Sequence, residues 1–316
     1  MPAAEPGPVP SWPQPTGVHR SFWDFGDFGA FWTNQSRGSW HCVRVGIIRP
    51  HWSIAPQHSL AKERQSQKQI ITLSGLHTMT EPEFRIRPGA SADLAEAADV
   101  WIAAFGDDWI IRKLHPKRSE YPQDFRAWAH RFFYGRFWGP EQQMLHILTV
   151  PDAKLPSGER IAAFSWWRRP YPTPADKAAV EGNLTIRGWL KPVLLGINKL
   201  AGYLWPARSA DVASLNMFDD SHLASDDILN DPAHPKRKNA WYLSTLAVSP
   251  DFQGKGYGSV LVREGLRQSD KEGVTAWLIG LRGVEPFYER LGFETKGRAN
   301  VGRLADWDGG SIMLRE

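Results

Sequence analysis

The stretch that most constrains the fold of this chain runs from Leu243 to Gly258, LSTLAVSPDFQGKGYG. A run of strand character ends near Val248, a turn holding Gly254 and Gly256 follows, and a helical pattern begins at its end. Glycine lets the backbone approach a ligand closely and adopt conformations that other residues avoid. The first amides of a helix have no partner within it and attract phosphate. The stretch therefore predicts a strand–turn–helix unit that binds a diphosphate group.

The bulk properties exclude several classes of protein. The chain has 316 residues, enough for one large or two modest domains, and its hydrophobic fraction of 42% is adequate for a globular core. The net charge of +4 is spread along the chain, unlike the clustered basic residues of a nucleic-acid-binding protein. The single cysteine, Cys42, cannot form an internal disulfide. We therefore expect no nucleic-acid partner, and we expect an intracellular, cytoplasmic location.

Residues 1–78 differ from the rest of the chain. They begin with a proline-rich segment and continue with SFWDFGDFGAFW, in which aromatic residues alternate with glycines, and no helix or strand period persists. A partner-docking motif is one interpretation, and a disordered extension is the other. Because TEPEFRIRPG, directly after Met79, resembles the natural start of a domain, we expect 1–78 to be an extension, with Met79 as the true start of translation.

From residue 82 onward the pattern is that of a mixed α/β sheet covered by helices. A strand at 84–87 is followed by a helix that Ser91 is expected to cap, and a second helix spans about 121–137. Strands at 144–150 and 160–167 form a hairpin around the turn PDAKLPSG. After the glycine turn we expect a helix, a strand at 275–281, a short helix at 284–291 closed by Gly292, and strands from Phe293 and at 311–314.

Residues 168–238 interrupt this order as an insertion. The segment 188–205 is apolar and predicted to be helical after Pro192, but it is too short and too interrupted to span a bilayer, so we expect no transmembrane segment. It either lies on a membrane surface or packs over the domain as part of a lid. Five aspartates follow, at 219, 220, 226, 227 and 231. They are either a solvated loop or a surface that attracts a cationic amine.

Two motifs together indicate a family. The run Val248-Ser-Pro-Asp-Phe-Gln-Gly-Lys-Gly-Tyr-Gly258 resembles motif A of the Gcn5-related N-acetyltransferase (GNAT) superfamily, with its Q/R-x-x-G-x-G/A core. About thirty residues later, Pro286-Phe-Tyr-Glu-Arg-Leu-Gly-Phe293 resembles motif B. The resemblance covers residues 82–316, and is to fungal-type GNAT-domain proteins with an insertion before motif A. It implies an acyl-CoA N-acyltransferase fold: a mixed, mostly antiparallel sheet, flanked by helices and splayed between the 242–248 and 275–281 strands.

The same resemblance implies that acetyl-CoA is the co-substrate, with no metal. Its pyrophosphate would lie against the turn, which comprises Gln253, Gly254, Lys255, Gly256, Tyr257 and Gly258, with Ser259 nearby. Its pantetheine arm would pair with the strand edge at Leu246, Ala247 and Val248. Backbone amides near Val248 would stabilise the developing oxyanion.

The catalytic residues follow from the same comparison. Tyr288 matches the motif B tyrosine and would protonate the departing thiolate, since a phenol with a pKa of about 10 can serve a thiolate with a pKa of about 8.5. The expected positions of a base hold Tyr242 and Ser244, neither of which is a base at neutral pH, so they are assigned to a proton relay. The structural interpretation of all three is packing and lining of the cleft.

The predicted function is acetyl transfer from acetyl-CoA to a primary amine, by direct attack in a ternary complex. The acidic insertion favours a cationic small molecule over a protein as the acceptor, and the oligomeric state is left open. The alternative is a non-catalytic acyl-CoA-binding or regulatory module, which the missing base makes conceivable. A third class, a membrane-associated or partner-binding protein, would rest on 188–205 and the aromatic leader.

Overall fold

The computed structural model describes residues 84–214 and 217–316. These two ranges contain nearly all of the segment that the sequence indicates to be a folded domain. The expected extension over 1–78, the start at Met79 and the single cysteine lie outside the described residues.

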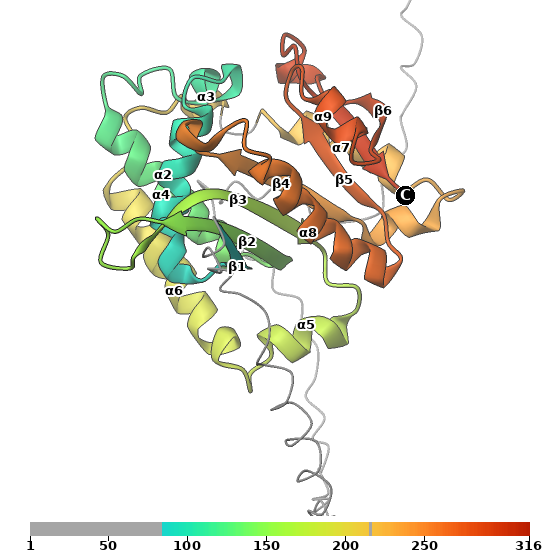
Figure 1. The fold of residues 1–316 in the computed structure, drawn as a ribbon, viewed down its shortest axis with the longest axis horizontal. Helices are drawn as coiled ribbons and strands as arrows, with labels where there is room; N and C mark the ends of the chain where they lie inside the picture. The colour runs from blue at the N-terminus through green and yellow to red at the C-terminus, as the bar shows by residue number, and fades with distance from the viewer. Residues whose placement is uncertain (1–83, 215–216) are drawn as a thin grey trace, which may run out of the picture. The chain divides into compact units, whose positions relative to one another are not determined.

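Within the described ranges, seven strands form one sheet in the order β1-β2-β3-β4-β5-β7-β6 (Figure 1). Their bounds are β1 Arg85–Pro88, β2 Gln142–Pro151, β3 Glu159–Arg169, β4 Trp241–Val248, β5 Ala276–Gly280, β6 Glu294–Arg298 and β7 Ser311–Arg315. Every neighbouring pair is antiparallel except β4 and β5, which are parallel. The sheet is therefore mixed and mostly antiparallel, which confirms the fold class expected from the sequence.

Helices cover the sheet on both faces. Their bounds are α2 Leu94–Phe105, α3 Trp109–Leu114, α4 Pro122–Phe137, α5 Pro174–Glu181, α6 Ile186–Leu204, α7 Asp219–Leu229, α8 Tyr257–Glu272 and α9 Glu285–Glu289. Because side chains alternate along a strand, Trp166 of β3 packs with α2 and α4 while the next residue, Trp167, packs with α8. Figure 1 shows α8 lying in front of the central strands.

Helix α8 packs closely against the sheet at Gly265. A Cβ atom at this position would come 2.1 Å from Nε1 of Trp167, which is fully buried on β3. Only a residue without a side chain fits there. The position of α8, and with it the position of the glycine turn that precedes it, is therefore set by a contact between a glycine and a tryptophan.

The start of α2 differs from the expectation that Ser91 caps it. A 3₁₀ turn at Ser91–Asp93 precedes the helix, and its N-cap is Ala90. The carboxylate of Asp93 accepts the Ala90 N–H at 2.7 Å and also binds the guanidinium of Arg87 at 2.7 Å. These charge-assisted bonds hold the pKa of Asp93 below its usual range, with the Arg87 hydrogen bond as the main cause. The acid outcompetes the serine hydroxyl because an ionised acceptor forms the stronger bond.

The described residues of the insertion contain three α-helices, α5, α6 and α7, and two expectations about the insertion need correction. The aspartates at 219, 220, 226 and 227 lie in α7, not in a loop. The apolar helix begins before Pro192, at Ile186, and continues through it. Its side chains at Ile186, Trp189, Val193, Ile197 and Leu200 are all more than half exposed. Within the described part of the chain, no helix combines the length and apolar character needed to cross a membrane.

Candidate functional site

Strands β4 and β5 part after a short parallel contact. They pair only at Trp241 with Ala276 and at Tyr242 with Trp277. Opposite β3, the pairing skips Ser244, which marks a β-bulge on β4. A bulge bends its strand and increases the local twist, so β4 turns away from β5 beyond this point. The splay expected between these two strands is therefore present.

The parting leaves one edge of β4 without a strand beside it among the described residues. The Ser249 N–H donates to the carbonyl of Ala162 on the β3 side, at 2.9 Å. Since successive backbone amides point to opposite sides of a strand, the N–H groups of Leu246 and Val248 point towards the gap, and that of Ala247 points towards β3. Ala247 is buried against the α2 side of the sheet. Two of the three residues predicted to pair with pantetheine thus present their backbone amides to the gap.

The glycine turn connects β4 to α8 in the way the sequence suggests. Gly254 and Gly256 have positive φ angles of 77° and 80°, and Gly256 is the N-cap of α8. A Cβ atom on either would meet nothing within 4 Å, so it is the backbone conformation that requires glycine there. Gln253, Lys255 and both glycines are exposed. The amides at the start of α8, which a helix leaves without intrahelical partners, therefore lie beside an open surface.

Tyr257 is the exception within this predicted phosphate-binding set. Its side chain is buried, with ring centroids 5.3 Å from Phe84 and 6.3 Å from Phe252. It anchors the start of α8 on the core, so its ring is not available to a ligand. Gly258 differs too, because a Cβ atom there would make ordinary contacts with Phe287, Val248 and Leu246.

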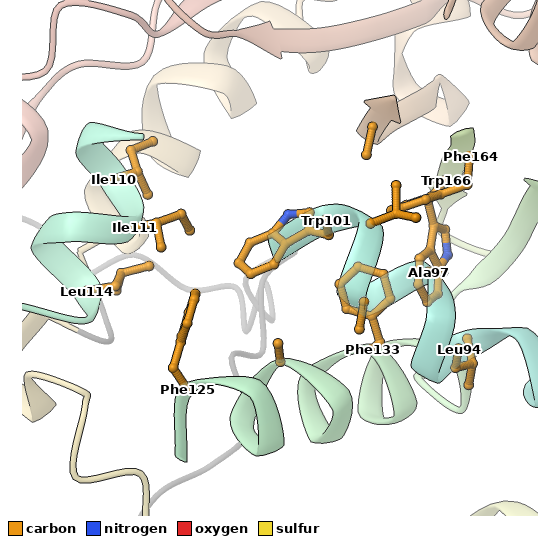
Figure 2. Close-up of a cluster of buried hydrophobic side chains, with 14 of the residues drawn as sticks. Leu94, Ala97, Trp101, Ile110, Ile111, Leu114, Phe125, Phe133, Phe164 and Trp166 are labelled. Atoms are coloured by element: carbon orange, nitrogen blue, oxygen red, sulfur yellow. The ribbon is translucent and has the colours of Figure 1, made fainter. Parts of the chain in front are cut away.

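A cavity of about 300 Å³ lies where β4 and β5 part. Its floor includes Leu243 to Leu246 of β4 and Leu278 to Gly280 of β5. Its wall is aromatic, formed by Trp101, Phe105, Trp128, Phe132, Phe218 and Trp307. Figure 2 shows Trp101 of α2 opposite the Ile110, Ile111 and Leu114 side chains of α3, with Phe125 of α4 beside them. The cavity is therefore a largely apolar space next to the unpaired edge of β4.

Tyr288 of α9 lines this cavity. Its ring packs edge-on against Phe287 and Phe293, at centroid distances of 4.9 and 5.8 Å. Burial raises the pKa of its phenol above the ordinary value, because the charged phenolate is disfavoured away from water. The hydroxyl therefore keeps its proton at neutral pH, which is the state that a proton donor needs.

Tyr242 and Ser244 also line the cavity. Tyr242 stacks on Trp277 at 4.2 Å, and burial is the main cause that raises its pKa. The Ser244 hydroxyl donates to the carbonyl of Trp166 at 2.8 Å and accepts from Nη2 of Arg136 at 2.5 Å. Both side chains can pass a proton along hydrogen bonds, but neither is an anion that would take one up.

Two charged side chains that line the cavity, those of Asp108 and Arg136, were not predicted from the sequence. Asp108 caps α3, accepting the Ile110 N–H at 2.9 Å, and burial raises the pKa of its carboxyl. Its position in Asp-Trp-Ile-Ile could have been recognised as a helix cap, but not as part of a cavity. Arg136 looks like an exposed cation near the end of α4. Only the tertiary structure brings it to β4.

The described residues contain no group of three or more His, Cys, Asp or Glu arranged to hold a metal ion. Asp226 and Asp227, which suggested a cationic acceptor, are not among the residues that line the cavity. The acidic segment therefore supports nothing about this site.

Known proteins that resemble this chain include one relative and two solved structures. A protein with 22% identity over 230 residues is described as an acetyltransferase of Stachybotrys chartarum, and the match covers 72% of this chain and 88% of that protein. A structure described as histone acetyltransferase HPA2 and related acetyltransferase, from Corynebacterium glutamicum, has 17% identity, covers 74% of this chain and 96% of its own, and has a TM-score of 0.45. PaiA N-acetyltransferase from Thermoplasma acidophilum, solved with coenzyme A, has 11% identity, coverages of 74% and 99%, and a TM-score of 0.34.

The family assignment rests on the family model rather than on those structures. Residues 162–293 match the model of the acetyltransferase (GNAT) family. The matched range runs from β3 through the glycine turn to the end of motif B, and so includes the parted strands. This part of the chain is therefore similar to the acetyltransferase (GNAT) family.

Proposed function

We propose that the protein transfers an acetyl group from acetyl-CoA to a primary amine of a small molecule. The observation that carries this proposal is the parting of β4 from β5, which leaves backbone groups facing a gap beside a cavity. An extended ligand can pair with this edge of β4 as an added strand would. The glycine turn at one end and the cavity at the other match a long molecule with a phosphate group and a reactive tip.

The residues present fit such a co-substrate. The amides from Gly254 to Ser259 would hold its pyrophosphate, since they are in the exposed turn or at the start of a helix. The Gln253 amide instead donates to the carbonyl of Pro250 at 3.3 Å, so Gln253 would contribute through its exposed side chain. The amides of Leu246 and Val248 would hold the pantetheine arm. When bound, acetyl-CoA supplies an activated thioester.

Side chains of the protein would then transfer two protons, one to the leaving sulfur and one away from the amine. The amine nitrogen forms a bond to the acetyl carbon as the carbon–sulfur bond breaks. Tyr288 donates its phenolic proton to the leaving sulfur, and its raised pKa keeps that proton in place beforehand. The amine proton leaves through the hydroxyls of Tyr242 and Ser244. We assign its final acceptance to Asp108, because burial raises its pKa and so makes it a better base than an exposed carboxylate.

The test is release of free thiol from acetyl-CoA by the full chain, measured against a panel of primary amines. We expect amine-dependent release above the background rate of hydrolysis. A matched pair of proteins, unchanged and Tyr288→Phe, separates turnover from contamination. Tight binding of CoA without thiol release on any amine would contradict the proposal and would assign a non-catalytic acyl-CoA-binding module.

A further inference from the structure

Among the described residues, the guanidinium of Arg136 is a cation beside the cavity that has no carboxylate within salt-bridge distance. Its Nη1 donates to the Thr245 hydroxyl at 3.0 Å and its Nη2 to the Ser244 hydroxyl at 2.5 Å, and both partners are neutral. Its Nε is buried and makes no hydrogen bond within the described ranges. Desolvation by burial is the main cause that lowers its pKa.

A neighbouring arginine, Arg168, shows how the desolvation cost of a guanidinium is offset elsewhere in the protein. Arg168 of β3 is buried, whereas Arg136 is half-buried, and Nη1 of Arg168 lies 3.0 Å from a carboxylate oxygen of Glu141. Arg136 instead lies over aromatic rings, 4.5 Å from the centroid of Trp166 and 5.2 Å from that of Phe132. Cation–π contacts offset part of the desolvation cost of a buried charge but do not replace an anion. Arg136 is therefore suited to take its anion from a ligand.

The location of Arg136 limits where that anion can be. Both hydroxyls that hold the guanidinium lie on β4, immediately before Leu246, whose amide faces the gap. Under the proposed function, on which this inference rests, the acceptor nitrogen must also reach that gap. An anion bound by Arg136 therefore has to be separated from the amine by only a few bonds, as in an α-amino acid.

The rest of the cavity indicates the side chain. Trp101, Trp128 and Phe132 give it aromatic walls, and Ile110 and Ile111 add aliphatic surface. The one carboxylate among the lining residues, Asp108, is held at the start of α3 by the Ile110 amide. A polyamine would meet the cation of Arg136 and only one carboxylate among these lining residues. We propose that the acceptor is an α-amino acid with a large apolar side chain, whose carboxylate pairs with Arg136.

Matched acceptors that differ only in the carboxylate test this directly. Binding of phenylalanine and phenethylamine, and of tryptophan and tryptamine, is measured by calorimetry with the full chain saturated with CoA. We expect each amino acid to bind about tenfold or more tightly than its decarboxylated partner, as a charge-assisted pair would give. Equal or weaker binding of the amino acids would overturn the inference.

Variants locate the effect. Arg136→Met should reduce each preference to less than about threefold, while leaving the melting temperature unchanged or higher, because a half-buried cation that makes no salt bridge is removed. If that variant fails to fold, Arg136→Lys keeps a cation but loses the fork, and the preference should fall without disappearing. A preference that survives in Arg136→Met contradicts the assignment.

A matched control is Arg187→Met. Arg187 of α6 also lies over an aromatic ring, 5.2 Å from the centroid of Trp138, but it has a carboxylate nearby, Glu181 at 3.9 Å. It does not line the cavity, so its loss should leave the preference unchanged. Thiol release from acetyl-CoA is recorded in parallel. A carboxylate preference in binding without thiol release would refute the proposed function and leave only the carboxylate-binding role of Arg136. Turnover without the preference would refute the role of Arg136 and leave the proposed function.

Discussion

The two sides of the candidate site present different chemical groups to a ligand: one presents backbone amides and the other presents side chains. The cofactor half, comprising the unpaired edge of β4, the glycine turn at 253–256 and the first turn of α8, offers backbone amides. The acceptor half, comprising the cavity wall from α2, α3 and α4 together with Trp307, offers side chains. One half is continuous in the sequence. The other is collected from segments separated by up to about 200 residues.

This difference determines how each half can vary. A backbone site tolerates many side chains, provided that glycine occupies the positions with positive φ. A side-chain site changes its ligand with every substitution. A protein can therefore keep one co-substrate and change its acceptor through the wall alone. Substitutions in the cofactor half should affect all acceptors equally, and those in the acceptor half should discriminate among them.

The largest effect is expected at Tyr288, where the two halves meet. Tyr288→Phe removes the proposed proton donor and keeps the ring, so kcat should fall about 100-fold for every acceptor, as is typical for loss of a general acid. The measurement is steady-state thiol release. Tyr203→Phe, at an exposed position on α6, is the matched control. Full turnover by the Tyr288 variant would remove the proton-donor role.

A smaller effect is expected at Asp108, in the acceptor half. Asp108→Asn keeps a good helix cap for α3 and removes the proposed proton acceptor. We expect kcat to fall by about tenfold to 100-fold with little change in thermal stability. Asp107→Asn serves as the control, because that neighbouring side chain is fully exposed. A loss of stability that matches the loss of activity would indicate a capping role only.

The cofactor half is challenged by Gly256→Ala. A non-glycine residue at a φ of 80° carries a strain of about 1–2 kcal/mol. The turn should relax away from its present shape, raising KM for acetyl-CoA about tenfold with the same ratio for all acceptors. Gly196→Ala, in the open middle of α6, should change neither parameter. An effect that depends on the acceptor would contradict the division between the halves.

The smallest expected effect is a change in the pH dependence of stability, caused by His115, which packs behind the wall of the acceptor half. His115 is buried behind the wall, 4.2 Å from Trp128 between ring centroids and with Nδ1 3.1 Å from Oγ of Ser209. Burial lowers its pKa from 6.5 to about 4. The unfolded chain therefore binds the proton more readily, so stability falls as pH drops below 6.5 and continues to fall until about 4.

Between pH 8 and pH 6 this linkage amounts to about 1 kcal/mol. Urea unfolding of the unchanged protein and of His115→Gln at both pH values measures it. The variant should be less stable at pH 8 and less sensitive to acid. An equal pH dependence in the two proteins would show that other groups are responsible.

The sequence was informative where local rules decide the structure. The positive φ angles at Gly254 and Gly256 are the reason the glycine turn could be predicted, since few other residues adopt them. The succession of the strands along the chain was predicted from alternation and turn residues, whereas their order within the sheet was not. The prediction that Ser91 caps the helix was wrong, because the carboxylate of Asp93, which is paired with Arg87, accepts the Ala90 N–H instead.

The acceptor half could not be predicted in the same way. Arg136 lies one turn after Phe132 on α4, where a cation normally indicates an exposed position. Its contacts with Ser244 and Thr245 span more than 100 residues of sequence, and no local pattern encodes them. The place of Asp108 in the cavity could not be predicted either, because its role as a helix cap is sufficient to explain an aspartate at this position. Sites assembled from distant side chains become visible only in the folded chain.

The short pairing of β4 with β5 also bears on how the protein responds to its co-substrate. In most sheets the backbone groups of a central strand are paired with neighbouring strands of the same chain. Here the amides of Leu246 and Val248 on β4 face the gap and can pair with a ligand. A ligand that fills the gap would join two parts of the sheet that otherwise meet over only two residue pairs. The binding free energy of this ligand would then add to the free energy of unfolding of the protein. Saturation with co-substrate would thus set the resistance of the central sheet to unfolding as well as the rate of reaction.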